Sequence, residues 1–487
     1  MLLQHLMADQ LATEIKINSL KAILSPIKKV PGEVMSIIFE CCVLPFAPET
    51  FMDVDELRPR YRRPVAPPLV LSQVCRSWRD LALSLPKLWS NIEACITQGP
   101  YMGISSFVHS AEKQTNIVAH YVKHSKSCPL ACKVQIEASQ EALLTCQNTI
   151  KQLLGLLAAQ SNRWRSMTLS FPGEDTPISP ILESIQGDLT CLRFLKISRE
   201  KRARMPFVLF PAGAPVPLDH SPMLLGNAPM LVGLHFYGTS FSPSVVRWTQ
   251  LKDLSIDQPI DYRIDAISNC KNLEKLSLAF SFLSQDISST TLITFPKLQI
   301  LAVHACGNTA ALNSLLASFT VPQLRMLSIT TSDHTREVQL APFLHRLSRP
   351  LEALEIDISS VDPIILVEWL RLVPSLRELS FGIRSILTHE MTHSLAPNGD
   401  EEFICPSLIR LRANFRCSLS SLVDMMEKRW SLGPSPKILV VNYWSTLSGE
   451  DGERFVSREA TISRFKSLCK EGLEFSFKPN EDELALP

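Results

Sequence analysis

The sequence predicts an α/β protein in which a helical segment is followed by a solenoid with a curved parallel sheet. Two observations support this class. Stretches of helical periodicity bounded by prolines occupy residues 27–95. From residue 161 onward, leucines recur in a fixed pattern, which is typical of units that stack side by side. A chain of 487 residues is too long for one ordinary core, so we expect a smaller helical part and a larger body.

Composition excludes several classes of protein. The chain has 45% hydrophobic and 20% charged residues, which is typical of a globular protein, and its net charge of +1 predicts no nucleic-acid partner. No run of about 18 apolar residues occurs, so we expect no membrane span and no membrane partner. The 13 cysteines include no Cys-x-x-Cys pair. Reduced thiols in a cytoplasmic or nuclear protein are therefore expected, with a zinc or disulfide framework as the less favoured alternative.

Residues 1–26 predict an N-terminal helix. Leucine and isoleucine recur with rough heptad character from Leu2 to Leu24, and the pattern ends at Ser25-Pro26. We favour one amphipathic helix that packs on the segment after it. A coiled coil that dimerises the protein is the alternative, because three heptads are too few to decide.

Residues 27–95 predict two helices separated by a loop. The first helix begins at Pro31 and has Val34, Ile37 and Ile38 on one face. The second spans a stretch whose apolar residues recur at spacings of three and four, and Pro86 ends it. These apolar residues are Leu71, Val74, Cys75, Trp78, Leu81 and Ala82. The proline-rich stretch between the helices, residues 44–66, predicts a surface loop, and its basic run 58–63 is more often solvated than bound to an acidic partner.

The order of these features resembles the F-box, the motif by which substrate receptors join cullin–RING ubiquitin ligases. Val-Pro-Gly-Glu at residues 30–33 and Val-Cys-Arg-Ser-Trp at residues 74–78 carry the resemblance. The opening at residues 25–34 and the insertion after it are similar to F-box proteins of mushroom-forming fungi. The resemblance implies a Skp-type adaptor, and through it a cullin, as partners. The residues that would meet the adaptor are Pro31, Val34, Ile38, Leu71, Val74, Trp78 and Leu81.

Residues 96–160 predict a helical hinge or cap, with one strand between Cys128 and Ile136. Residues 161–470 form the body, in which a Leu-x-x-Leu-x-apolar pattern recurs at intervals of roughly 20 to 32 residues. The pattern resembles the leucine-rich repeats of F-box receptors, although the consensus Asn or Cys after each strand is mostly absent. Residues 199–229 predict a loop, with a nuclear localisation signal at residues 199–204 as the less favoured interpretation. Residues 471–487 predict a C-terminal tail.

Side chains that alternate with the repeat leucines should project from the opposite face of each strand. We expect this concave face to bind a target protein, because its charges are mixed; a merely solvated sheet face is as favoured for any single residue. The predicted substrate-binding residues are His235, Tyr237, Asp253, Asp257, Lys275, His304, Glu355, Asp357, Glu378, Arg410 and Arg412.

One motif suggests an enzyme. His389-Glu390-x-x-His393 matches the zinc peptidase pattern, in which two histidines hold the metal and the glutamate is the general base. However, this stretch falls where the outer segment of a repeat belongs, with Met391 and Leu395 as its packing face. No Walker loop and no Gly-x-Ser-x-Gly elbow occurs. We therefore expect no enzyme, metal or cofactor, and predict the substrate-recognition subunit of a Skp–cullin–F-box ligase. The alternatives are a non-catalytic repeat scaffold outside a ligase and, remotely, a zinc peptidase.

Overall fold

The computed structural model divides into two compact units, residues 1–168 with 184–192 and residues 169–183 with 193–487. The described residues are 7, 10–14, 16–17, 26–43, 67–99, 101–172, 189–200, 228–237, 246–256, 264–281, 292–306, 309–331, 338–358, 361–382, 385–396, 404–417, 419–432, 438–444 and 455–477. Both predicted loops, at residues 44–66 and for most of 199–229, lie outside these ranges. No helix within them is long and apolar enough to cross a membrane.

The first unit contains a group of short helices. After the 3-10 turn η1 (Pro26–Lys29), α2 (Gly32–Cys42) begins at its N-cap Pro31, as predicted. The single helix predicted next is two helices, α3 (Pro67–Val74) and α4 (Arg76–Ser84). Cys75 has an extended backbone, with φ −158°, and its Sγ accepts the backbone N–H of Trp78 at 3.5 Å. Because Cys75 is the N-cap of α4, the chain turns where the apolar spacing suggested a continuous helix.

A parallel strand pair with a helical crossover follows. The strands β1 (Asn91–Thr97) and β2 (Leu130–Glu137) pair in parallel, and α5 (Ile104–His124) connects them. The strand expected near residue 130 is therefore present as β2, whereas β1 was not predicted. The remaining elements of this region are η3 (Pro86–Trp89), α6 (Gln140–Thr145), α7 (Gln147–Ala158), η4 (Ser161–Arg163) and β3 (Trp164–Pro172), which spans the boundary of the units.

The second unit is built on a large parallel sheet, which confirms the α/β class. Each strand pairs with the next in chain order. The strands are β4 (Phe194–Glu200), β5 (Gly233–Tyr237), β6 (Asp253–Ile256), β7 (Lys275–Ser281), β9 (Ile300–Cys306), β11 (Met326–Thr331), β12 (Ala353–Ile358), β13 (Glu378–Phe381), β15 (Arg410–Arg416), β16 (Ile438–Trp444) and β17 (Glu474–Phe477). Two short strands, β8 (Ile293–Thr294) and β10 (Phe319–Thr320), pair with one another, and β14 (Ile386–Thr388) pairs with β15.

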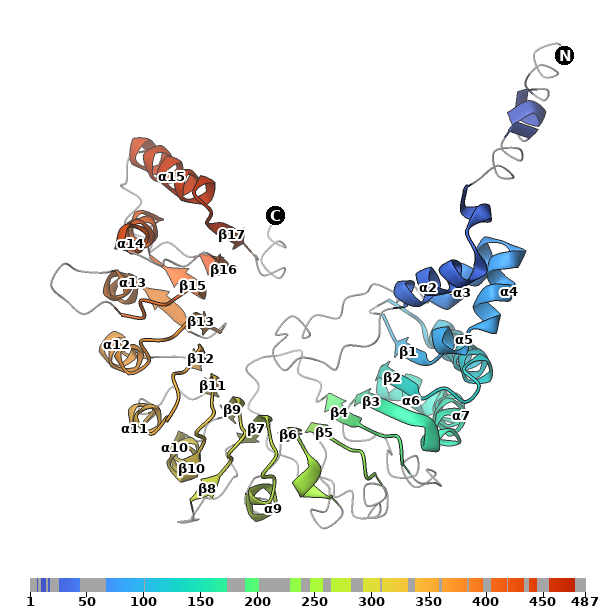
Figure 1. Ribbon diagram of the computed structural model, residues 1–487, viewed down its shortest axis with the longest axis horizontal. Coiled ribbons are helices and arrows are strands. Elements are labelled where there is room, and N and C mark those ends of the chain that lie inside the picture. The colour runs from blue at the N-terminus through green and yellow to red at the C-terminus, as the bar shows by residue number, and fades with distance from the viewer. Residues whose placement is uncertain are drawn as a thin grey trace. The chain divides into compact units, whose positions relative to one another are not determined.

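Helices cover one side of this sheet, and the strands line the other (Figure 1). The repeat leucines lie in register across it, for example Leu234, Leu254, Leu276 and Leu301, and all four are fully buried. The covering elements are η6 (Trp248–Gln250), α9 (Ile264–Ser268), α10 (Thr309–Ser318), α11 (Ala341–His345), α12 (Pro363–Arg371), α13 (His389–Leu395), α14 (Leu419–Leu432) and α15 (Phe455–Lys470). One unit cannot bury its apolar face alone, so stacking supplies the core.

Both ends of the chain differ from the prediction. Strand β17 lies inside the predicted tail, where it extends the sheet by pairing Phe475 with Leu439. Near the N-terminus, the described residues of segment 1–26 include Met7, Leu11 and Ile17, whose exposed fractions are 63%, 60% and 45%. These three side chains therefore lack the packing partner that we expected from the helices after them.

Candidate functional sites

The helices α2 and α3 expose large aliphatic side chains to solvent. Val34, Ile37 and Ile38 of α2 are 45%, 63% and 44% exposed, and Val70 and Val74 of α3 are 46% and 57% exposed. The two helices contact one another, so we call these five side chains the apolar surface of α2 and α3. Exposed groups of this size are typical of binding surfaces rather than of free protein surface. Ile37 and Val70 were not among the predicted adaptor contacts, although the three-to-four spacing on each helix could have identified them.

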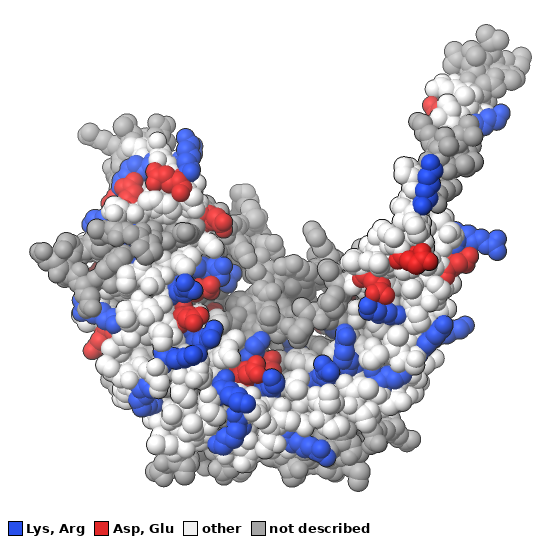
Figure 2. Space-filling model, viewed as in Figure 1, with Lys and Arg blue, Asp and Glu red and all other residues white. Residues whose placement is uncertain are grey.

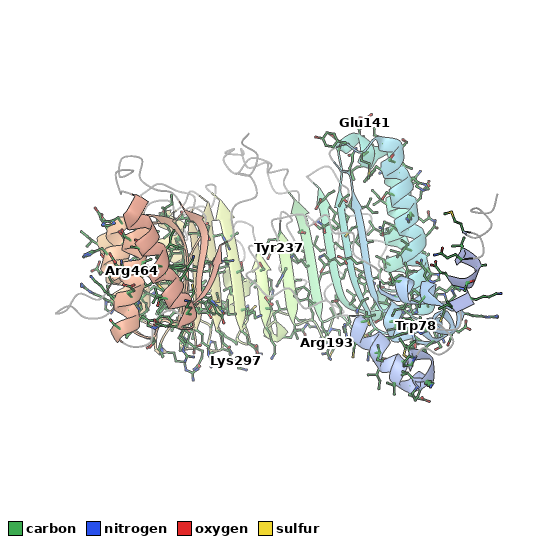
Figure 3. All side chains as sticks on the ribbon, turned by 90° about the horizontal axis from the view of Figure 1, so that it is seen from above. Trp78, Glu141, Arg193, Tyr237, Lys297 and Arg464 are labelled. Carbon is green, nitrogen blue, oxygen red and sulfur yellow. The ribbon has the colours of Figure 1, made fainter. Side chains whose placement is uncertain are left out.

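The predicted adaptor residues fall into two groups. Pro31, Val34, Ile38 and Val74 are exposed, whereas Leu71, Trp78 and Leu81 are half-buried. The Trp78 ring packs edge-on against Phe39 of α2, with 5.0 Å between the ring centroids. Trp78 lies among the helices of the first unit (Figure 3). Its first role is thus to hold α4 against α2, and only its outer edge is free for a partner.

The strands of the second unit place the predicted substrate-binding residues on one face of the sheet, which we call the inner face. Three rows in register hold most of them. The first row contains Asp253, Lys275, Glu378 and Arg410; the second, His235, Glu355 and Arg412; the third, His304 and Asp357. Tyr237 follows His235 by two residues on β5 and so lies on the same face. Asp257 lies outside the described residues. In Figure 3, Tyr237 lies among the strands, whereas Arg193 and Lys297 lie at the edge where the strands begin.

At β4 to β6 the inner face is held together by polar and aromatic contacts. The Nε2 atom of His235 lies 2.9 Å from Oδ1 of Asp253, and the ring of Phe194 packs edge-on against the imidazole at 4.7 Å. The Ser255 hydroxyl donates a hydrogen bond of 2.7 Å to the Tyr237 hydroxyl. His235 is only 2% exposed, so it differs from the accessible side chain that the sequence predicts. It orients its neighbours, whereas Tyr237 keeps a partly exposed ring.

Gly233 makes room for the Phe194 ring, because an added Cβ would lie 2.3 Å from the ring atom Cδ2. We expect Gly233→Ala to lower the free energy of unfolding of the second unit by about 1–3 kcal/mol, since the ring must leave its place on His235. Urea denaturation measures this. The control is Gly155→Ala on α7, where an added Cβ meets nothing within 4 Å and a helix-interior alanine is expected to stabilise by about 0.5–1 kcal/mol. If both variants changed the free energy of unfolding equally, the close contact between Gly233 and the Phe194 ring would be contradicted.

Charged side chains gather on the inner face of β12, β13 and β15; Glu355, Asp357, Glu378, Arg410 and Arg412 are hereafter the charged cluster. Arg410 pairs with Glu378 at 2.9 Å. The Ser328 hydroxyl of β11 donates to Oε2 of Glu355 at 3.1 Å. Burial raises the pKa of Glu355, and the Ser328 hydrogen bond and the charge of Arg412 partly oppose that shift.

The His-Glu-x-x-His stretch is the short helix α13 of the second unit. Met391 and Leu395 are 5% and 2% exposed, which confirms them as its packing face. His389 and His393 are exposed, and Nδ1 of His389 lies 3.0 Å from the Ser421 hydroxyl. Within the described ranges, no group of three His, Cys, Asp or Glu side chains is placed to hold a metal ion.

A surface pocket of about 390 Å³ opens along α5 beside α3, and sequence analysis missed it. Polar residues at helical spacing on α5 are the signal that could have found it. Burial, followed by the charge of Lys123, lowers the pKa of His120 at its end. The lining residues are Leu69, His109, Glu112, Lys113, Asn116, Ile117 and His120.

The fold defines the chain as an α/β protein with a large parallel sheet of stacked strand units. No family model matches the chain, and no curated protein matches it. Among solved structures, a crystal structure of a Bacteroides fragilis protein, determined as a structural-genomics target, is similar at 12% sequence identity and a TM-score of 0.33. The match covers 77% of this chain and 84% of that chain. At such a TM-score, the likeness carries no argument about function.

Proposed function

We propose that this chain is the substrate receptor of a Skp–cullin–F-box ubiquitin ligase in the cytoplasm or nucleus. In this proposal, α2, α3 and α4 bind a Skp-type adaptor, and the inner face of the second unit binds a target protein. The chain performs no chemistry. It raises the local concentration of the target beside a ubiquitin-loaded enzyme, which is catalysis by proximity.

The apolar surface of α2 and α3 is the observation that carries the proposal. Five aliphatic side chains are 44–63% exposed on two helices that contact one another. The opposite face of α2 is packed, because Met35 and Phe39 are 5% and 0% exposed. The exposed side chains are therefore presented on an ordered helix rather than left over from a missing core. Covering them would remove apolar area from water, at about 25 cal/mol per Å².

Adaptor binding tests the proposal directly. We expect the wild-type chain to bind a purified Skp-type adaptor. Val34→Glu combined with Val74→Glu should raise the dissociation constant by at least about 100-fold, since charges replace two side chains that the adaptor would bury. Isothermal titration calorimetry measures this. The control is Ile364→Glu on α12, an isoleucine that is 77% exposed on the second unit and should leave binding unchanged.

The choice of substitutions follows from the packing. Trp78→Ala would also remove the contact with Phe39, so a loss of binding in that variant would not separate misfolding from a lost contact. Val34 and Val74 have exposed side chains, and thermal melting should be unchanged when they are replaced. A wild-type chain that does not bind the adaptor would contradict the proposal and leave the repeat unit as a scaffold outside a ligase.

A further inference from the structure

The turns that precede the strands of the second unit carry a row of basic side chains. Backbone hydrogen bonds of 2.8 Å join each turn to the next, from the turn before β4 to the turn before β13. The residues of this row, each directly before a strand, are Arg193, Val232, Lys252, Glu274, Gln299, Arg325, Glu352 and Arg377. Lys297 stands two residues before Gln299, and Figure 3 shows it at the same edge as Arg193. The basic edge is hereafter Arg193, Lys252, Lys297, Arg325 and Arg377.

Three members of the basic edge have no acidic partner among the described residues. Arg193, Lys297 and Arg377 are all exposed. The guanidinium groups of Arg193 and Arg377 make no side-chain hydrogen bond or ion pair within the described ranges. The Nζ atom of Lys297 donates only to a neutral group, the amide oxygen Oδ1 of Asn272, at 2.8 Å. These three positive charges are therefore available to an acid from outside the chain.

The other two members form ion pairs that water screens. Lys252 pairs with Glu274 at 2.8 Å, and Arg325 pairs with Glu352 at 4.0 Å. The four side chains are 41–56% exposed, and pairs this open to solvent are weak. Figure 2 shows basic side chains predominating over the lower part of the second unit, although the net charge of the whole chain is only +1. The edge thus keeps a local excess of positive charge.

The length and composition of the row decide which acidic partner fits. Neighbouring strands are about 4.8 Å apart, so the row from Arg193 to Arg377 is about 34 Å long, which about ten residues of an extended peptide span. A nucleic acid carries a negative charge at every position and would meet Glu274 and Glu352, whereas a protein segment need not. The row also contains no aromatic side chain on which a base could stack. An acidic protein segment therefore fits better than a polyanion.

We propose that the basic edge binds an extended segment of the target protein that is rich in aspartate and glutamate. Its carboxylates pair with the exposed ammonium and guanidinium groups of the edge. The edge adjoins the inner face, because Lys252 directly precedes Asp253 of the first row, so one target can contact both surfaces. The cations stand on long side chains, so the edge selects for charge and length rather than for an exact order of residues. This inference rests on the proposed function, because it names the class of segment that the receptor selects.

Fluorescence anisotropy with a labelled peptide tests the inference. The probe is a peptide of about ten residues in which aspartate and glutamate alternate with serine and glycine, and its counterpart has asparagine and glutamine at the acidic positions. We expect the full-length chain to bind the acidic peptide but not the amide counterpart. Affinity should fall at least about tenfold between about 0.01 M and 0.15 M salt, because the Debye length shrinks from about 30 Å to about 8 Å.

Variants of the three members without an acidic partner localise the binding. Arg193→Gln, Lys297→Gln and Arg377→Gln together should raise the dissociation constant at least about tenfold, since three charge contacts are lost. Glutamate at the same positions should abolish binding. Because these side chains are exposed, melting should be unchanged in the glutamine variant, which keeps the test valid if the glutamate variant does not fold.

The matched control removes the same number of positive charges from the helices α14 and α15. Lys428→Gln, Lys466→Gln and Lys470→Gln replace exposed side chains outside the row and should leave peptide binding unchanged. The inference is overturned if the acidic peptide does not bind at low salt, if its amide counterpart binds equally, or if both triple variants weaken binding to the same extent.

Single-stranded DNA of similar length is the competing ligand. If it binds more tightly than the acidic peptide and loses binding in the variant of the basic edge, the edge is a polyanion site and the inference is overturned. This assay contains no adaptor, so adaptor binding without peptide binding rejects the inference alone. Peptide binding without adaptor binding rejects the ligase function instead.

Discussion

Replacing Arg429 by methionine should destabilise the second unit by about 3–5 kcal/mol, because three buried carbonyl groups each lose a hydrogen bond from a charged donor. Arg429 lies on α14 and is fully buried. Its Nη1 donates to the carbonyl oxygens of Leu395 at 2.8 Å and Ile404 at 3.1 Å, and its Nη2 donates to that of Cys405 at 2.6 Å. Methionine keeps the length and most of the volume of the side chain, so the decrease in the free energy of unfolding measures the loss of the hydrogen bonds.

The site has two features that make Arg429 hard to replace. Leu395 ends α13, and Cys405 has a φ of +48°, in the left-handed region that costs a non-glycine residue about 1–3 kcal/mol. The guanidinium fixes both segments to α14. Burial lowers the pKa of Arg429 to about 10, so the group is still charged at neutral pH and donates to all three carbonyls.

Arg464 is the control for Arg429. It pairs with Asp424 at 2.6 Å and Glu427 at 2.5 Å, but its side chain is 41% exposed, and exposed pairs contribute about 0–1 kcal/mol. Urea denaturation combined with hydrogen exchange of peptides from α13 and α14 compares Arg429→Met with Arg464→Met. If the free energies of unfolding of the two variants differ by less than about 1 kcal/mol, Arg429 does not hold α13 in place.

Replacing Trp89 by alanine should destabilise the first unit by about 3–5 kcal/mol, the usual cost of removing a large buried aromatic side chain. Trp89 is fully buried at the end of η3. Its indole N–H donates to the Ala82 carbonyl of α4 at 2.8 Å, and its ring packs edge-on against His120 and Tyr121 of α5, at 5.0 and 5.1 Å. The side chain thus joins the short helix α4 to the crossover helix α5 of the same unit.

Two further variants separate the contributions at Trp89. Trp89→Phe keeps an aromatic ring but removes the indole donor to Ala82, whose carbonyl still accepts the Leu85 N–H. It should therefore cost less than alanine, with the lost hydrogen bond contributing about 0.5–1.5 kcal/mol. Tyr101→Ala removes an aromatic side chain that is fully exposed and should cost less than about 0.5 kcal/mol. Hydrogen exchange measures the effect as the loss of amide protection in peptides from α4 and α5. Unchanged protection in Trp89→Ala would show that the helices do not depend on this contact.

Local sequence patterns predicted much of the fold. The Leu-x-x-Leu-x-apolar spacing predicted the strands from β4 to β13 other than the short β8 and β10, because alternation and burial of leucines act within a few residues of each other. Pro31 marked the start of α2 in the same way. The packing face of α13 was also readable, since Met391 and Leu395 are one helical turn apart. The rows of polar residues on the inner face follow from the same alternation.

Other features depended on contacts that sequence spacing does not encode. The apolar spacing ran through Cys75, yet an extended backbone there divides α3 from α4. His235 alternates with leucines like its neighbours, but Phe194 and Asp253 from adjacent strands bury it. The first outcome reflects the local capping of α4 by Cys75, and the second is set by side chains on the neighbouring strands.

The sequence by itself determined most of the strands of the second unit and the apolar face of each of them, although not β1, β17 or the division of α3 from α4. Only the tertiary structure decided which polar side chains meet. Arg429 reaches carbonyl groups 24 to 34 positions earlier in the chain, and Arg412 faces Glu355 across an intervening strand. Periodicity is a property of neighbouring residues, whereas these pairings depend on strand register and on how consecutive units stack.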